Sequence, residues 1–189
     1  MRQAILRYII IIAPIQARPI LRMPPDPAYS EALVSAIARF RAGSASSAAA
    51  EAPLLPSWRD ENWHQLFEFT NLRNVKAGGV LIRRGEADRT LFFVTRGELE
   101  VIVHSGNGLS MDRVALLGPG SVLGELAFFD SGPRSAGAWA VSDCEVAAMT
   151  SDQYSAFEQS HPKLARDLLF ALGRILALRL RATNARLIS

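Results

Sequence analysis

Hydrophobic and polar positions change their period along the chain, which divides it into a helical beginning, a strand-rich middle and a helical end. Between residues 71 and 149, short apolar stretches are separated by glycines every few residues, as is typical of strands joined by turns. Leu99, Val101 and Val103 alternate with polar neighbours, which is the period of a half-buried strand. No alternation of strands with long helices occurs here, so we predict an antiparallel barrel or sandwich rather than a parallel sheet.

Helical spacing returns after Met149 and continues to the end of the sequence. Thr150 is followed three residues later by a glutamine, a capping-box pattern that predicts the start of a helix. A longer helix is expected from Pro162 onward. Its apolar stripe recurs at intervals of three or four residues and consists of Leu169, Leu172, Leu176, Leu180, Thr183 and Leu187. The helix also contains Arg174, Arg179 and Arg181, which fall outside this stripe and are expected in solvent.

The first part of the chain, residues 1–55, is interpreted as an N-terminal extension, and residues 56–189 as the main folded domain. Within the extension, a helix is predicted to begin at Pro27 and to end at Gly43. Its apolar face is formed by Leu33, Ile37 and Phe40. The segment 42–53 is rich in alanine and serine and is typical of a linker.

A short apolar run, Tyr8–Ile12, lies near the start of the chain. It is far shorter than the roughly 20 residues that span a bilayer. Pro14 interrupts it, and no small-residue cleavage site follows. Three interpretations stay open: a peripheral membrane contact, a start codon assigned too early, and a signal-like segment. The single cysteine, Cys144, excludes an intrachain disulfide and fits a reducing compartment, so we expect a cytoplasmic protein.

The charge distribution argues against a general nucleic-acid binder. Residues 53–162 hold nine Lys or Arg against fourteen Asp or Glu, and such an acidic centre is poorly suited to a phosphate backbone. Residues 163–189 hold six basic residues against one acidic residue, which we interpret as a solvated helix face. Three scattered histidines and one cysteine give no zinc-site spacing, so no metal site is predicted.

Known catalytic motifs are missing from the sequence. Gly118, Gly120 and Gly124 come close to the dinucleotide-binding pattern G-x-G-x-x-G, but the spacing is one residue too long. No Gly-Lys-Ser/Thr sequence follows, and Ser121 lacks the G-x-S-x-G frame of a nucleophile. We therefore predict no catalytic residues and no cofactor.

The most informative segment is 120–136, which reads GSVLGELAFFDSGPRSA. Gly124 can lead into a short helical turn whose first amide groups favour an anion, and its missing side chain would allow close approach of a ligand. Arg134 can neutralise a phosphate, and Glu125 can accept a hydrogen bond from a sugar hydroxyl. These groups together would form a cradle for a nucleotide phosphate and ribose. The alternative is a surface salt bridge between Glu125 and Arg134 beside a tight turn.

Gly124-Glu-Leu-Ala127 followed by Pro133-Arg-Ser-Ala136 resembles the phosphate-binding cassette of cyclic-nucleotide-binding domains. This family includes catabolite-activator-like proteins, cyclic-nucleotide-dependent kinases and channels, and regulatory domains of bacterial transporters. The similarity covers about residues 58–187. Segments 77–86, 91–101 and 144–146 resemble further strands of the family in the same order. The fold implied is an antiparallel jelly roll (a double-stranded β-helix) followed by a long C-terminal helix.

The resemblance implies a set of ligand-binding residues. They are Gly124, Glu125, Leu126, Ala127, Arg134, Ser135, Thr183 and Asn184. Glu125 would accept from the ribose 2′-hydroxyl, Arg134 would pair with the cyclic phosphate, and these two form a pair of buried charges. Thr183 and Asn184 would contact adenine, which favours cAMP as ligand, with cGMP as the second choice. Thr183 is equally well explained as a polar residue in a helix seam.

The function that follows is non-catalytic sensing of a cyclic mononucleotide, signalled by movement of the C-terminal helix to an effector protein that the sequence does not name. The same helix is expected to form a homodimer. No helix-turn-helix follows within the 189 residues, so direct sequence-specific DNA binding is not expected. The alternative is a structural or dimerisation domain of the same fold that binds no nucleotide.

Overall fold

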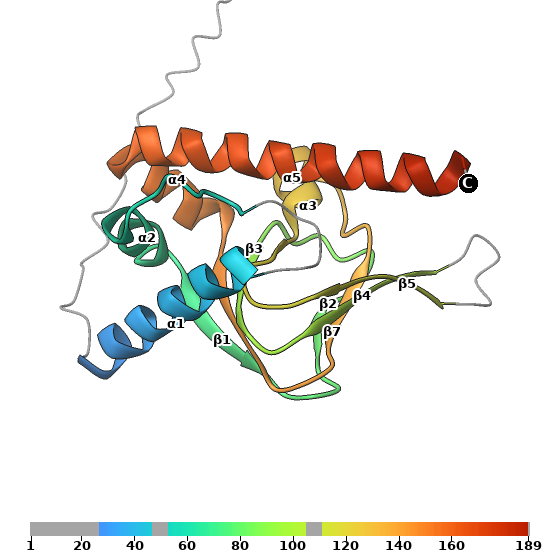
Figure 1. Cartoon of the computed structure of the whole chain (residues 1–189), viewed down its shortest axis with the longest axis horizontal. Coiled ribbons are helices and arrows are strands. Elements are labelled where there is room, and N and C mark those ends of the chain that lie inside the picture. Colours follow the sequence, from blue (N-terminus) through green and yellow to red (C-terminus); the bar gives the residue numbers. More distant parts are fainter. Residues whose placement is uncertain (1–26, 47–52, 105–110, 189) are drawn as a thin grey trace, which may run out of the picture.

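The computed structural model describes residues 27–46, 53–104 and 111–188. Two β-sheets face each other, and a long final helix runs across the top of the molecule (Figure 1). The elements are, in chain order, α1 (Pro27–Ser46), α2 (Asp60–Phe67), β1 (Asn71–Val75), β2 (Val80–Ile82), β3 (Leu91–Arg96), β4 (Leu99–His104), β5 (Met111–Leu117), β6 (Val122–Leu123), α3 (Glu125–Asp130), β7 (Gly137–Ala140), β8 (Cys144–Met149), α4 (Ser151–Ser160) and α5 (Pro162–Ile188).

Both sheets are antiparallel and have four strands each, in the orders β1-β8-β3-β6 and β2-β7-β4-β5. The predicted antiparallel jelly roll with a long C-terminal helix is therefore confirmed. The strict alternation predicted for β4 holds only as far as Val101. A β-bulge shifts the register between Val101 and Ile102, and Ile102 is consequently buried.

Strand β3 is buried on both faces, which explains its unbroken apolar sequence. Phe92 and Val94 point between the two sheets, whereas Leu91 and Phe93 point outward to the helices. The cluster between the sheets consists of Ile82, Phe92, Val94, Leu99, Leu117, Leu123, Ala138, Ala140, Cys144, Val146 and Ala148.

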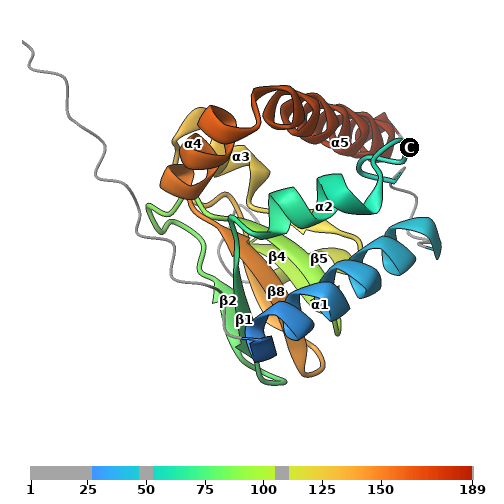
Figure 2. The same ribbon diagram turned by 90° about the vertical axis from the view of Figure 1, so that its left-hand side faces the viewer.

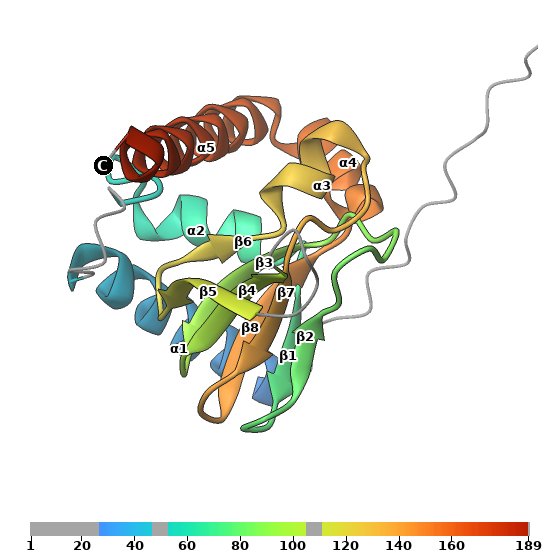
Figure 3. The same ribbon diagram turned by 90° about the vertical axis from the view of Figure 1, so that its right-hand side faces the viewer.

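A second apolar core lies on the outer face of the sheet that contains β3, where α1, α2, α4 and α5 cover the strands (Figures 2 and 3). Phe40 of α1 is fully buried, and its ring centroid lies 5.3 Å from that of Trp63 in α2 and 5.8 Å from that of Phe93 in β3. Arg39 of α1 forms an ion pair with Glu145 of β8. The division of the chain at residue 55 stays a prediction, but α1 on its N-terminal side packs directly on the sheet.

Helix α1 does not end at Gly43, as predicted, but continues to Ser46. Glycine is needed at this position for a different reason. A Cβ atom on Gly43 would lie 2.2 Å from the carbonyl oxygen of Pro119, in the loop that leads to β6.

Because α1 extends to Ser46, the first residues assigned to the linker, 42–46, are helical. Residues 47–52 and the apolar run Tyr8–Ile12 lie outside the described residues. In the described part of the chain, no helix is both long and apolar enough to cross a membrane.

The start of α4 agrees with its sequence signature. The hydroxyl of Thr150 accepts a hydrogen bond from the backbone N–H of Gln153, at 3.2 Å. The side-chain oxygen of Gln153 accepts one from the backbone N–H of Thr150, at 2.9 Å. Both members of the capping box are thus present, and the prediction is confirmed.

Helix α5 begins at Pro162 as predicted. The leucines of the predicted stripe, however, do not all face the same surroundings. Leu172 is fully buried against its own domain, whereas Leu180 is 62% exposed. A different apolar row faces outward, with spacings of three, four and three residues: Phe170, Gly173, Ala177 and Leu180. The sequence pattern merged two faces of the helix, because alanines and glycine carry little weight in a search for apolar periodicity.

We predict that Phe40→Ala lowers the free energy of unfolding by about 3–5 kcal/mol, because it removes a fully buried ring between α1, α2 and β3. Urea denaturation followed by tryptophan fluorescence measures this. Val34→Ala is the control on the same helix, since Val34 is 52% exposed and its loss is expected to cost less than about 0.5 kcal/mol. Equal, small effects for both variants would show that α1 is not part of the core.

Candidate functional site

A cavity of about 510 Å³ opens between the second sheet, the segment 123–138 and α5. Its walls are mainly apolar. They are formed by Ile82, Val101, Val103, Val114, Ala115, Leu116, Leu117, Leu123, Gly124, Glu125, Leu126, Ala127, Arg134, Ser135, Ala136, Gly137, Ala138, Leu178, Arg179, Ala182 and Thr183. The cavity therefore brings together the predicted cassette and the C-terminal helix.

Gly124 forms the sharp corner between β6 and α3. Its φ angle of +88° lies in the left-handed region, where a side chain is strained. A Cβ atom there would also lie 2.4 Å from Nη1 of Arg134 and 2.5 Å from the carbonyl oxygen of Thr90. From the sequence we expected a ligand to approach Gly124 closely. In the structure, Arg134 and the carbonyl oxygen of Thr90 occupy this space.

Glu125 begins α3 and is buried, with 6% of its surface exposed. One carboxylate oxygen accepts a hydrogen bond from Nη1 of Arg179 in α5, at 2.6 Å. Nη2 of Arg179 donates to the carbonyl oxygen of Val122 in β6, at 2.8 Å. The expectation that Arg179 lies in solvent is wrong, because the helix turns this arginine toward the cavity. Arg179 ties α5 to the segment that forms the cavity wall.

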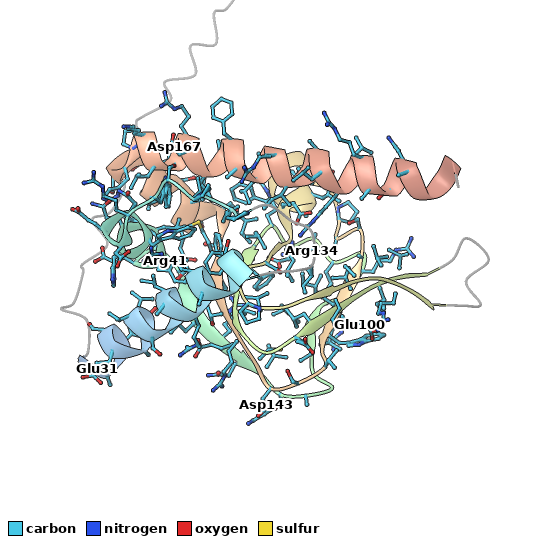
Figure 4. The ribbon with its side chains drawn as sticks, in the orientation of Figure 1. Glu31, Arg41, Glu100, Arg134, Asp143 and Asp167 are labelled. Atoms are coloured by element: carbon cyan, nitrogen blue, oxygen red, sulfur yellow. The ribbon has the colours of Figure 1, made fainter. Side chains whose placement is uncertain are left out.

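Arg134 is also buried, and it lies beneath α5 (Figure 4). Its Nη2 donates to Asp88 at 2.5 Å and to the carbonyl oxygen of Thr90 at 2.7 Å, and its Nη1 donates to the carbonyl oxygen of Gly124 at 3.1 Å. The guanidinium carbon lies 5.6 Å from the centre of the Phe92 ring. The Nε–H group is buried and has no hydrogen-bond partner among the described residues.

The two predicted charges are thus both buried, but they do not pair with each other. Glu125 pairs with Arg179, and Arg134 pairs with Asp88. Sequence reasoning missed both partners. A signal for Arg179 existed, since it lies one helical turn before Thr183 and residues four apart share a helix face.

Asp88 lies in the connection between β2 and β3. The backbone of the same connection forms two hydrogen bonds with the backbone of Arg134. The N–H of Arg134 donates to the carbonyl oxygen of Glu86 at 2.9 Å. The N–H of Gly85 donates to the carbonyl oxygen of Arg134 at 2.8 Å. Partial burial raises the pKa of Asp88, but hydrogen bonds from Arg134 and Thr90 outweigh this effect and hold the pKa below its usual value. Asp88 is therefore a carboxylate anion at neutral pH.

The remaining predicted residues fall into two groups. Leu126, Ala127, Ser135 and Thr183 all line the cavity, although the hydroxyl of Thr183 donates to the backbone carbonyl of Arg179 at 3.0 Å. Asn184 is exposed on α5 and is not part of the cavity wall. The cavity offers a buried cation, a buried carboxylate and long apolar walls, a combination suited to a ligand with an anionic group, a hydroxyl and a flat apolar ring.

No group of three or more potential metal ligands occurs in the ranges that the structure describes. Near the cavity, the charged side chains are instead engaged in ion pairs.

Comparison with known proteins gives a consistent result. The family model of the cyclic nucleotide-binding domain matches residues 72–161. The cyclic AMP receptor protein of Thermus thermophilus is 30% identical over 123 residues, which are 65% of this chain and 56% of that protein. Glutaminase 2 of Bradyrhizobium diazoefficiens is 31% identical over 121 residues, which are 64% of this chain but 18% of that protein.

Solved structures share the fold. The Thermus thermophilus catabolite activator protein superposes with a TM-score of 0.63 and 29% identity, covering 72% of this chain and 62% of that one. A cyclic nucleotide-binding domain from Methylobacillus flagellatus superposes with a TM-score of 0.69 and 21% identity, covering 82% of this chain and 84% of that one. The chain spans about half the length of the cyclic-AMP-regulated relatives that it matches. Residues 72–161 belong to the cyclic nucleotide-binding domain family.

Proposed function

We propose that this domain binds a cyclic mononucleotide, preferring cAMP, and acts as a non-catalytic sensor. The observation that carries the proposal is the Arg134 guanidinium, which is 4% exposed, lines the cavity and has an Nε–H group without a partner in the described structure. A buried donor without an acceptor costs about 1–3 kcal/mol, so an anion that accepts from it is favoured. A cyclic phosphate supplies such an acceptor.

The other parts of a nucleotide find matching groups in the same cavity. Glu125 and Ser135 both line the cavity. The carboxylate would accept a hydrogen bond from a ribose hydroxyl, and the Ser135 hydroxyl would contact the phosphate or the base. The apolar walls of β4 and β5 suit the faces of a purine. Thr183 lies on the cavity wall at α5 and is our candidate for contacting the adenine amino group, whereas Asn184, the second residue expected there, lies outside the cavity wall. cAMP is therefore expected to bind more tightly than cGMP, which competition binding measures.

The signal is proposed to leave through α5. Arg179 connects this helix to Glu125, so a ligand that bonds to Glu125 changes the interaction that holds the helix. The ligand shifts the helix only by the difference in its affinity for the two helix positions. We propose that an effector protein in a cytoplasmic setting receives the signal, and that the described residues make no direct sequence-specific DNA contact.

The alternative function is a structural domain that keeps the fold and binds no nucleotide. Thermal unfolding separates the two, because a ligand that binds only the folded state raises the melting temperature in a concentration-dependent manner. A constant melting temperature up to millimolar cAMP and cGMP would favour the structural role.

We predict that Arg134→Ala weakens cAMP binding at least about 30-fold, since it removes the buried cation that faces the phosphate. Isothermal titration calorimetry measures the affinity. Glu125→Gln should cause a smaller loss, because it changes only the charge of one hydrogen-bonding group. Arg84→Ala is the control, as Arg84 is an exposed arginine in the β2–β3 connection. Wild-type affinity in a folded Arg134→Ala protein would refute the site.

We further propose that α5 forms a homodimer through its outward-facing row of Phe170, Gly173, Ala177 and Leu180. Phe170 is 74% exposed and Leu180 62% exposed, which is costly for residues of this size in water. The spacing of three and four residues is that of a coiled-coil seam, and the two small residues allow close approach of a second helix. This row replaces the leucine stripe expected from the sequence, in which Leu172 is already buried.

We predict that Leu180→Glu shifts the protein from dimer to monomer in sedimentation velocity, because it places a charge in the seam. Ala185→Glu is the matched control: Ala185 is exposed on the same helix but lies off the outward row. A monomeric wild-type protein, or a Leu180→Glu protein that stays dimeric, would contradict the proposed seam.

A further inference from the structure

The ion pair between Arg134 and Asp88 has an unusual position relative to the cavity. Arg134 lines the cavity, but Asp88 does not, so the carboxylate contacts the guanidinium from outside the ligand space. The side chain of Asp88 is 46% exposed, whereas that of Arg134 is 3% exposed. The second oxygen of Asp88 is fixed by Thr90, which donates from its backbone N–H at 3.1 Å and from its hydroxyl at 2.7 Å.

Arg134 has several contacts besides Asp88 that hold it in place. The guanidinium also donates to the carbonyl oxygens of Thr90 and Gly124 and lies over the ring of Phe92. Its backbone is bonded on both sides to the β2–β3 connection. These neutral contacts fix the position of the arginine, and Asp88 adds negative charge.

That charge acts against an anionic ligand in two ways. Nη2 has two hydrogens, and Asp88 and the Thr90 carbonyl take both, so a phosphate that uses Nε and Nη2 as a fork must share or displace one acceptor. The carboxylate also offsets the positive charge that attracts the phosphate. Glu125 and Arg179 form the other ion pair, so the charges of the three wall residues and of Asp88 outside the wall sum to zero.

We propose that Asp88 sets the affinity of the site, holding cyclic-nucleotide binding weaker than Arg134 alone would make it. This inference rests on the proposed function and adds a residue that controls it. Asp88 competes with the phosphate for the Arg134 guanidinium and so limits the affinity for the ligand. In the absence of ligand, the same ion pair stabilises the buried arginine. Substitution of this half-exposed residue would tune the nucleotide concentration that the sensor reports.

The test compares Asp88→Asn with the wild-type chain by calorimetric titration of cAMP. Asparagine keeps an acceptor for Arg134 and removes the charge, and we expect about fivefold tighter binding, the scale of a half-exposed ion pair. Binding of neutral adenosine should not change. Glu86→Gln is the matched control, because Glu86 is an exposed carboxylate of the same connection and should shift the affinity less than about twofold. In an Arg134→Ala background the gain should vanish.

Urea unfolding provides the second measurement, since Asp88→Asn should lower stability while it raises affinity. Asp88→Ser serves as a second variant if the asparagine form folds poorly. Unchanged or weaker cAMP binding by folded Asp88 variants would overturn the inference, because a positioning role predicts a loss. An equal gain from Glu86→Gln would also overturn it. If the wild-type chain binds no cyclic nucleotide, the proposed function itself fails, which is a different result from binding without the gain.

Discussion

A buried arginine must have its donors and its charge satisfied, and this requirement organises the side of the molecule that contains the cavity. Apart from its Nε–H, Arg134 meets it with two backbone carbonyls, an aromatic ring and a carboxylate, which come from two separate parts of the chain, segment 88–92 and Gly124. Gly124 must adopt a left-handed conformation without a side chain for the guanidinium to fit. The shape of the corner between β6 and α3 thus depends on the arginine as much as on the turn itself.

A second charge pair couples this corner to the last helix. Glu125 would be destabilising if it were buried alone, since unpaired buried charges carry a large desolvation cost. Arg179 pairs with it and also bonds to β6, so α5 lies against the cavity through a directed contact in addition to apolar packing. In the proposed function, a ligand that competes for Glu125 would therefore act on the helix directly. Ligand binding and the movement of α5 would then depend on the same carboxylate.

The sequence was informative wherever structure follows from local rules. The strand-rich middle, the capping box at Thr150 and the start of α5 are set by short-range periodicity and hydrogen bonding, and all three are confirmed. The residues of the cassette were identifiable because their order carries the resemblance. Their ion-pair partners were not, because Asp88 and Arg179 lie 46 and 54 positions away from Arg134 and Glu125 in the chain. Pairings across such distances depend on the tertiary fold.

The same limit explains the errors about the helices. Gly43 was interpreted as a helix end, yet it is required by the close approach of Pro119, which no local pattern reveals. The leucines of α5 were grouped on one stripe, but the domain covers Leu172 and leaves Leu180 exposed. Periodicity shows that a helix has an apolar side. It does not show which part of that side the rest of the chain will cover.

We propose that Arg134 binds the phosphate of a cyclic mononucleotide through its Nε–H, a donor without a partner among the described residues. The most direct test follows the Nε–H resonance of Arg134 by NMR, assigned with the Arg134→Lys variant, during titration with cAMP and with acyclic AMP. With cAMP, this resonance should change saturably at the affinity that calorimetry gives, and its response to AMP should be much weaker. A cAMP titration that saturates without moving the Arg134 resonance, or that produces no binding at all, would contradict it.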